Sequence, residues 1–180
     1  SVRVLDNLSA GKRANLPVDA PRLDFREGDI RDRAAVAAGV AGVDAVLHLA
    51  AQVSVQASVA EPATSAEHNI MGFINVLDAA RRAGVKRVAY ASSAAVYGTP
   101  QSIPLTEQSA VAPISPYGLE KLIDDHYASL FAQLHGLVPL GLRYFNVYGP
   151  RQDPRSPYAG VISKFVDAAL SARPVRIFGD

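Results

Sequence analysis

Short apolar segments alternate with longer amphipathic ones along this chain. The segments Val2–Leu5, Leu23–Arg26, Asp44–Leu49, Val85–Ala91 and Leu137–Tyr144 have the length and the residue types of strands. Several are apolar at almost every position, which is typical of strands buried on both faces of a parallel sheet. The pattern therefore predicts the α/β class, with helices covering a parallel sheet on both faces.

Three segments with helical spacing accompany these strands. The first, from Pro62 to about Ala83, ends before Gly84. A second helix is expected from Pro116 to about Leu134 and a third over Val161–Leu170, followed by a short strand at Val175–Phe178. The apolar stripe of the first helix is predicted to lie in the core: Ile70, Phe73, Val76, Leu77 and Ala80.

The second helix carries a tyrosine and a lysine four residues apart. Ser115 is expected to cap it, and Pro116 suits its first position because the N–H that proline lacks would have no partner there. Residues at i and i+4 lie one turn apart, so the Lys121 ammonium is expected to approach the Tyr117 phenol. Lowering a tyrosine pKa from ~10 to ~7 takes roughly 4 kcal/mol, which a nearby cation supplies in a partly dehydrated pocket. The spacing predicts a general acid/base pair, with a chance occurrence on a surface helix as the alternative.

Composition narrows the possible partners. A chain of 180 residues, 49% of them hydrophobic, is long enough for one domain with a core. A net charge of +1 without a basic run favours a small-molecule partner over nucleic acid. The histidines lack metal-ligand spacing, and no apolar run reaches the ~18 residues of a membrane span. The absence of cysteine excludes disulfides and thiolate chemistry, and we expect a cytoplasmic protein.

Polar residues follow the ends of the predicted strands. Because the carboxyl ends of parallel strands meet at one edge of a sheet, these residues are expected to line that edge: Asp6, Asp29, Gln52, Ser93 and Asn146. A carboxylate such as Asp6 suits the two hydroxyls of a ribose, which favours NAD over NADP, and a helix cap is the alternative. Asp29 and Ile30 suit a hydrogen bond and an apolar contact to adenine, with a plain turn as the alternative.

Seven motifs carry a resemblance to a known family. They are D-N-L-S, E-G-D-I-R-D, H-L-A-A-Q, N-I-M-G, S-S-A-A-V-Y-G, S-P-Y-G-L-E-K and L-R-Y-F-N-V-Y-G-P-R-Q-D-P, and together they cover nearly the whole chain. The chain resembles the extended short-chain dehydrogenase/reductase superfamily and, within it, the NAD-dependent epimerase/dehydratase family. It is most similar to epimerases of the UDP-glucose 4-epimerase type, and UDP-N-acetylglucosamine 4-epimerases are close.

The resemblance implies a Rossmann-type doubly wound sheet that binds NAD and a UDP-sugar. The catalytic residues that it implies are Ser93, Tyr117 and Lys121. The implied cofactor-binding residues are Asp6, Asn7, Ser9, Asp29, Ile30, Leu49, Ala50, Ala51, Gln52, Asn69, Tyr117, Lys121 and Tyr144. The implied substrate-binding residues are Ser54, Ser93, Tyr117, Asn146, Val161, Lys164 and Phe178.

The activity implied by the resemblance is inversion at C4 of a UDP-hexose through a transient 4-keto sugar, with Tyr117 as the base. Which sugar is bound stays open. A nucleotide-sugar 4,6-dehydratase, a decarboxylase or a UDP-glucuronate epimerase is the alternative, although dehydratases carry an acidic pair where this chain has Ala94 and Ala95. A non-catalytic nucleotide-binding module is a further alternative, which would be expected to lack the catalytic tyrosine or lysine.

The resemblance also implies a homodimer, in which the helices predicted at Pro62–Ala83 and Pro116–Leu134 form a four-helix bundle. Two features of the family pattern are absent: the glycine-rich G-x-x-G-x-x-G loop and the strand before it, which is central in a 3-2-1-4-5-6 sheet. We therefore expect an internal piece of a longer enzyme, with a partial NAD-binding domain at 1–150 and the start of a sugar-binding region at 151–180. Alone, this piece is expected neither to bind NAD tightly nor to turn over, because it lacks the helix N-terminus that holds the pyrophosphate.

Overall fold

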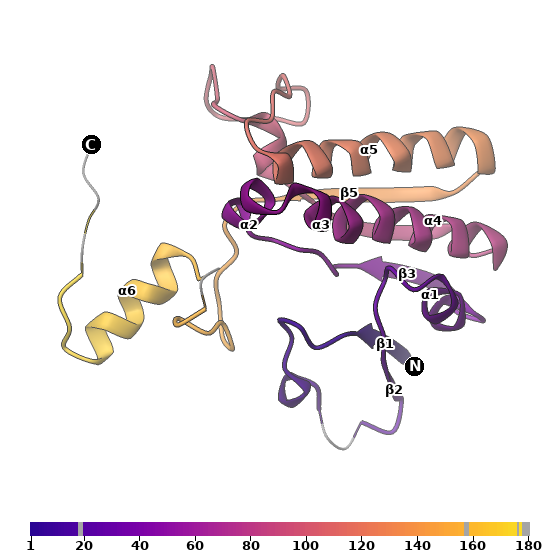
Figure 1. The fold of residues 1–180 in the computed structure, drawn as a ribbon, viewed down its shortest axis with the longest axis horizontal. Coiled ribbons are helices and arrows are strands. Elements are labelled where there is room, and N and C mark those ends of the chain that lie inside the picture. Colours follow the sequence, from indigo (N-terminus) through magenta and orange to yellow (C-terminus); the bar gives the residue numbers. More distant parts are fainter. Residues whose placement is uncertain (18–19, 157–158, 176, 178–180) are drawn as a thin grey trace. The chain divides into compact units, whose positions relative to one another are not determined.

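Parallel strands form the framework of the fold (Figure 1). This computed structural model describes residues 1–17, 20–156, 159–175 and 177. Its strands are β1 (Val2–Asp6), β2 (Leu23–Glu27), β3 (Ala45–His48), β4 (Arg87–Ser93) and β5 (Val138–Tyr144). Every pairing between them is parallel, and each strand overlaps a predicted one, so the predicted parallel α/β fold is confirmed.

The strands belong to two separate sheets. β1 pairs with β2, and β4 lies between β3 and β5. In the described part of the chain no ladder joins β1 to β3. In the 3-2-1-4-5-6 order expected from the resemblance, one further strand would lie between these two.

The helices are α1 (Arg33–Val40), α2 (Val55–Ala60), α3 (Pro62–Ala66), α4 (Gly72–Arg82), α5 (Pro116–His135) and α6 (Val161–Leu170), with short 3-10 turns η1 (Arg13–Asn15) and η3 (Ala94–Tyr97). The hydrophobic pattern predicts α5 and α6 but neither α1 nor α2. Both of these short helices begin at a capping side chain: Asp32 accepts hydrogen bonds from the first turn of α1, and Ser54 accepts one from Ala57 in α2. In such short helices the cap is the main local signal.

The helix predicted over Pro62–Ala83 is continuous but not uniform. Between α3 and α4 lies a π-helical turn, η2 (Glu67–Met71). π-Turns occur frequently at functional sites. Here the π-turn carries the buried residue Asn69. Its side-chain oxygen accepts the Gln52 N–H, and its side-chain nitrogen donates to the Gln52 carbonyl oxygen. Apolar periodicity cannot reveal this turn, because its cause is a contact with a distant loop.

The core lies between the three-stranded sheet and α4. Phe73 and Leu77 are fully buried, and the Phe73 ring packs between His48 and Tyr90 with centroid distances of 5.3 and 4.9 Å. The predicted apolar stripe is confirmed at Phe73, Val76, Leu77 and Ala80, while Ile70 is only half-buried.

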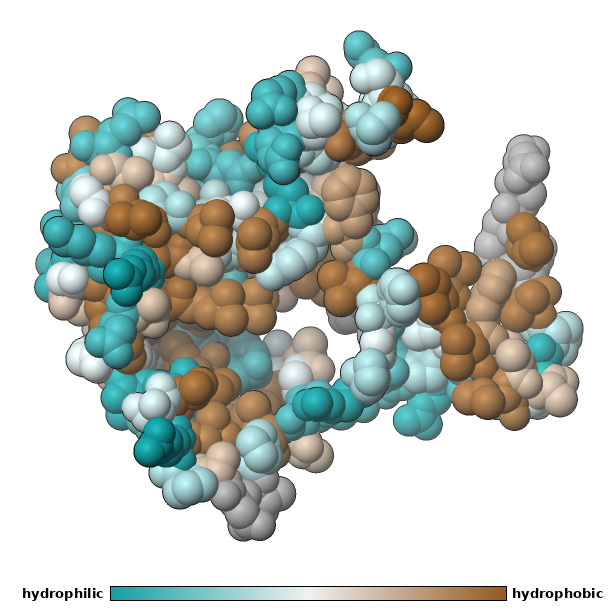
Figure 2. All heavy atoms as spheres, turned by 180° about the vertical axis from the view of Figure 1, so that it is seen from behind, coloured by the Kyte–Doolittle hydropathy of each residue, from teal (hydrophilic) through white to brown (hydrophobic). Residues whose placement is uncertain are grey.

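One face of the three-stranded sheet is covered by α4 and α5, which lie side by side (Figure 1). The other face is open among the described residues. Seen from behind these helices, apolar side chains form a band on the surface (Figure 2), and the exposed apolar residues of β3 and β5 include Leu47, Leu140 and Leu142. The expected helical layer is thus present on one of the two faces.

The chain forms two compact units, Ser1–Tyr144 and Phe145–Asp180. The predicted division at residue 150 falls within the second unit, which contains α6. The strand predicted at Val175–Phe178 lies partly outside the described residues. In the described part of the chain, no helix is long and apolar enough to cross a membrane.

Two helical glycines provide a paired test of packing. A Cβ at Gly72 would lie 2.4 Å from Cδ1 and 2.7 Å from Cγ1 of Ile30, whereas one at Gly39 would meet Leu5 at an ordinary 3.4 Å. Gly72→Ala should lower the free energy of unfolding by about 1–3 kcal/mol through overpacking. Gly39→Ala should raise it by about 0.5–1 kcal/mol, because alanine favours a helix interior. Urea unfolding measures both, and a Gly72→Ala protein as stable as the wild type would contradict the tight approach of α4 to Ile30.

Candidate active site

The first turn of α5 is held by side chains from two elements. Ser115 Oγ accepts a hydrogen bond from the Gly118 N–H at 3.1 Å, and Pro116 occupies the first turn, as predicted. Ser58 Oγ, from α2, accepts the Tyr117 N–H at 3.1 Å. These N–H groups have no partner within the helix, so the two serines fix the backbone that carries Tyr117. The contribution of Ser58 is absent from the sequence analysis, because no local pattern indicates a contact across 59 residues.

Gly118 lets this turn approach the 3-10 turn η3. A Cβ at Gly118 would lie 2.7 Å from the carbonyl oxygen of Ala95, a distance that backbone atoms cannot relieve cheaply. η3 follows Ser93, whose Oγ accepts the Ala95 N–H at 3.1 Å. The structure thereby packs the turn that begins at Ser93 against the turn that contains Tyr117.

Lys121 and Asp124 form a buried ion pair one turn further along α5. The Lys121 Nζ to Asp124 Oδ2 distance is 3.2 Å, and the two side chains are 3% and 1% exposed. Burial, together with the charges of Asp125 and Glu120, raises the pKa of Asp124 to about 7 against the opposing effect of Lys121. Burial and the charge of Lys121 also lower the pKa of His48, on β3, to about 3. Sequence reasoning misses Asp124 because a lysine and an aspartate three residues apart are typical of a solvated helix surface.

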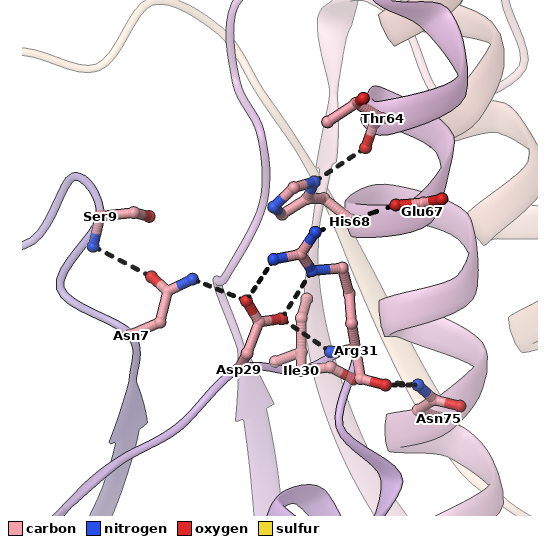
Figure 3. Close-up of polar contacts among 9 residues, drawn as sticks. All are labelled: Asn7, Ser9, Asp29, Ile30, Arg31, Thr64, Glu67, His68 and Asn75. Atoms are coloured by element: carbon pink, nitrogen blue, oxygen red, sulfur yellow. Dashed lines mark hydrogen bonds and ion pairs between the residues drawn. The ribbon is translucent and has the colours of Figure 1, made fainter.

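A polar cluster supports the loop after β1 (Figure 3). The Asp29 carboxylate accepts hydrogen bonds from Arg31 Nε at 3.0 Å and Nη2 at 2.8 Å, and from Asn7 Nδ2 at 3.0 Å. Asn7 Oδ1 in turn accepts the Ser9 N–H at 3.0 Å. The hydrogen bonds from Arg31 hold the pKa of Asp29 well below its usual range. With the Arg31 N–H also bonded to Oδ1, the carboxylate has a full set of donors, so the predicted bond to adenine would require an exchange.

The loops after β1, β2 and β3 surround one cavity of about 310 Å³. The predicted cofactor residues that line it are Asp6, Asn7, Ser9, Ile30, Leu49, Ala50 and Ala51. The lining residues that the sequence analysis does not assign to the site are Leu5, Ala10, Gly11, Gly28, Val53 and His68. The two glycines follow strand ends, which is the one signal by which sequence reasoning could have found them.

The chemistry of this cavity fits the adenosine half of a dinucleotide. Asp6 places a carboxylate at the end of β1, and its Oδ1 accepts the Leu8 N–H at 2.6 Å, which stabilises the positive φ of 56° at Leu8. A Cβ at Gly11 would lie only 3.1 Å from both carboxylate oxygens, so glycine keeps the space beside them open. The carboxylate suits ribose hydroxyls, and the apolar side chain of Ile30 suits a base.

The remaining predicted residues lie elsewhere. Gln52 and Asn69 are bonded to each other behind the loop that lines the cavity, and Ser54 is the buried cap of α2. Tyr144 ends β5 and is 41% exposed. Asn146, Val161 and Lys164 belong to the second unit, while Phe178 lies outside the described residues. No group of His, Asp or Glu suited to a metal ion occurs among the described residues.

The family model and the curated relatives agree on one family. The model of the NAD-dependent epimerase/dehydratase family matches residues 1–180. A putative UDP-glucose 4-epimerase of Methanocaldococcus jannaschii is 40% identical over 99% of this chain and 58% of its own length. The chain therefore spans little more than half of that relative.

Solved structures resemble this one closely. A UDP-N-acetylglucosamine 4-epimerase from Methanobrevibacter ruminantium, in complex with UDP-N-acetylmuramic acid, has a TM-score of 0.94 at 40% identity over 99% of this chain and 57% of its own. A double mutant of a dTDP-glucose 4,6-dehydratase from Streptomyces venezuelae, with NAD bound, has a TM-score of 0.87 at 41% identity over 99% of this chain and 55% of its own.

The buried pair on α5 predicts a pH dependence of stability. The pKa of Asp124 rises from 3.8 to about 7 on folding, so between these values the folded state binds more protons than the unfolded state. The Asp124 titration should therefore lower stability by a few kcal/mol as the pH rises through this window, while the lowered pKa of His48 acts in the opposite direction in the wild type and in the variant alike. Asp124→Asn lacks this titration, and its stability relative to the wild type should increase between about pH 5 and about pH 8 in urea unfolding.

The change with pH is the test, because the variant also leaves Lys121 without its carboxylate partner at every pH. The control is Asp44→Asn, the same substitution at an exposed residue. Parallel curves for the wild type and Asp124→Asn would show that Asp124 does not titrate in this window.

Proposed function

Because the chain belongs to the NAD-dependent epimerase/dehydratase family, we propose that the protein is a nucleotide-sugar 4-epimerase that inverts C4 of a UDP-hexose. One observation carries the proposal. The close approach at Gly118 sets the Ser93 turn beside the first turn of α5, which carries Tyr117 and, one turn on, the buried Lys121. A hydroxyl, a phenol and an ammonium are thus supplied from adjoining elements, as general acid/base chemistry on a sugar hydroxyl requires.

Each of these residues has a distinct role in the proposal. Tyr117 takes the proton from the sugar 4-OH and later returns one, and the Ser93 hydroxyl bonds to the same sugar oxygen. Lys121 provides a positive charge on the helix that carries Tyr117, in a site where burial weakens screening by solvent. NAD, when bound, supplies the reversible oxidation at C4 that passes through a 4-keto sugar.

The cavity after β1, β2 and β3 is proposed to hold the adenosine half of NAD. Asp6 would bind the ribose, and Asp29 would hold Asn7 and Ser9 in place through the cluster of Figure 3. Ile30 and the loop Leu49–Ala51 would supply the walls. The other residues assigned to NAD by this proposal are Gln52, Asn69, Tyr117, Lys121 and Tyr144.

The substrate is proposed to be a UDP-sugar, which the complex of the Methanobrevibacter relative with a UDP-sugar supports. The residues assigned to it are Ser54, Ser93, Tyr117, Asn146, Val161, Lys164 and Phe178. A 4,6-dehydratase is the second candidate, because one similar structure is of a double mutant of a dTDP-glucose 4,6-dehydratase. Dehydration needs its own acid and base after the catalytic serine, and η3 has Ala94 and Ala95 at those positions. The epimerase is therefore favoured.

The proposal predicts that Tyr117→Phe abolishes epimerisation while NAD binding persists. The whole protein is incubated with NAD and either UDP-galactose or UDP-N-acetylgalactosamine, and the C4 epimer is followed by NMR. Loss of the phenol should reduce inversion by several orders of magnitude, because no other group then takes the 4-OH proton. If the wild type binds NAD but returns both sugars unchanged, the epimerase proposal fails, and dehydratase, decarboxylase and uronate substrates should be tested.

We further propose that the protein is a homodimer in which two helices of each chain, the continuous helix of α3, η2 and α4 and the helix α5, form a four-helix bundle with their copies. The outer face of α5 supports this, because Leu119, Leu130 and Leu134 recur at helical spacing and are 49%, 47% and 71% exposed. Such a stripe favours burial against a second helix.

The double variant Leu130→Asp, Leu134→Asp should convert the dimer into a monomer, because it would bury unpaired charges in the bundle. Sedimentation velocity at micromolar concentration measures this in the whole protein. Ile103→Asp, at an 84% exposed apolar loop residue, is the control. A wild type that sediments as a monomer would refute the dimer.

A further inference from the structure

Glu120 is a buried acid that directly precedes the proposed catalytic lysine in the sequence. Its carboxylate forms hydrogen bonds with residues of other elements. The residue lies between Tyr117 and Lys121 in the sequence, and it is 3% exposed. Glu120 Oε2 accepts hydrogen bonds from Ser65 Oγ at 2.8 Å and from Asn69 Nδ2 at 2.6 Å. Lys121 has its own carboxylate partner in Asp124, so the role of Glu120 lies with α3 and the π-turn.

Asn69 connects Glu120 to the loop after β3. Its Oδ1 accepts the Gln52 N–H at 2.8 Å, and its Nδ2 donates to the Gln52 carbonyl oxygen at 2.9 Å. The Gln52 side chain donates to Ser65 Oγ at 3.1 Å and to the Ser54 carbonyl oxygen at 3.0 Å. Ser65 and Asn69 are each 1% exposed, so water does not compete for these bonds.

The Glu120 carboxylate ties the Asn69 amide to α5. An amide NH₂ has two hydrogens, and here one goes to the Gln52 carbonyl and the other to Glu120. The two bonds to the Gln52 backbone fix which way the amide points, and the bond to Glu120 anchors the amide on the side of α5. Without that acceptor, a buried N–H of Asn69 loses its partner, and the amide loses its hydrogen bond to α5.

We propose that Glu120 is a positioning residue that fixes the cavity-lining loop at 50–53 to the catalytic helix through Asn69 and Ser65. The inference rests on the proposed function, because the loop lines the cavity assigned to NAD. Glu120 acts on cofactor binding and leaves the placement of Tyr117 to Ser58 and Ser115, which hold the first turn of α5 independently.

The test compares Glu120→Leu with Glu120→Gln in the whole protein. Leucine removes the acceptor, and the Kd for NAD should rise by tenfold or more, as expected for loss of a buried charged hydrogen bond of roughly 1.5–3 kcal/mol. Glutamine keeps an oxygen acceptor, so its Kd should stay within about threefold of the wild type. In both variants kcat at saturating NAD should change by less than about threefold, because α5 keeps its own supports.

Two further measurements separate positioning from loss of fold. Hydrogen exchange at the Gln52 amide should accelerate in Glu120→Leu, because Asn69, which accepts that N–H, is no longer anchored to α5 and local opening of the loop becomes easier. Glu107→Leu, the same substitution at an exposed loop residue, should leave both the Kd and the exchange rate unchanged. If Glu120→Leu does not fold, Ser65→Ala removes one donor from the same carboxylate and should raise the Kd by about threefold.

An unchanged Kd in Glu120→Leu overturns the proposal, and so does a fall in kcat at unchanged Kd, because that result would place the action of Glu120 on α5. Failure of the proposed function has a different signature. In that case the wild type itself would not bind NAD or would not invert either sugar.

Discussion

The candidate site depends on how closely the first turn of α5 approaches the turn after β4. Gly118 permits a backbone contact with Ala95 that any side chain would prevent. The approach would have little value if the helix end were frayed, and the hydroxyls of Ser58 and Ser115 prevent that by binding its N–H groups. Gly118 allows the two turns to approach each other, and the two serines keep the end of the helix ordered. Together they set Ser93 and Tyr117 on adjoining turns.

Buried charge is the second constraint, since α5 carries three acids close to Lys121 in sequence: Glu120, Asp124 and Asp125. Each acid has a different partner: Glu120 binds the π-turn, Asp124 binds Lys121, and Asp125 accepts from Tyr90 at 3.0 Å and from Arg143 at 3.1 Å. Isolated carboxylates in such surroundings would be costly, so each partner is part of the reason the acid is tolerated. The helix is thereby tied to the sheet on one side and to the loop around the cavity on another.

The division of the strands into two sheets gives the cavity its setting. β1 and β2 carry the loops with Asp6 and Ile30, while β3 carries the loop with Leu49. All three loops follow carboxyl ends of parallel strands, where ligands bind in open α/β sheets. In the described part of the chain no ladder joins β1 to β3, so the loops around the cavity come from two separate sheets.

Local relations between neighbouring residues were enough to predict much of this protein. Strand positions, the bounds of α6, the cap at Ser115 and the set of acids and small residues at strand ends all depend on residues close in sequence, which a pattern can express. The seven motifs, S-P-Y-G-L-E-K and S-S-A-A-V-Y-G among them, together identified the family on the same basis. The tertiary structure alone decided which distant groups meet: Ser58 with Tyr117, Glu120 with Asn69, and the burial that raises the pKa of Asp124. Periodicity indicates that a side chain faces inward, but the group opposite it is chosen by packing between elements far apart in the chain.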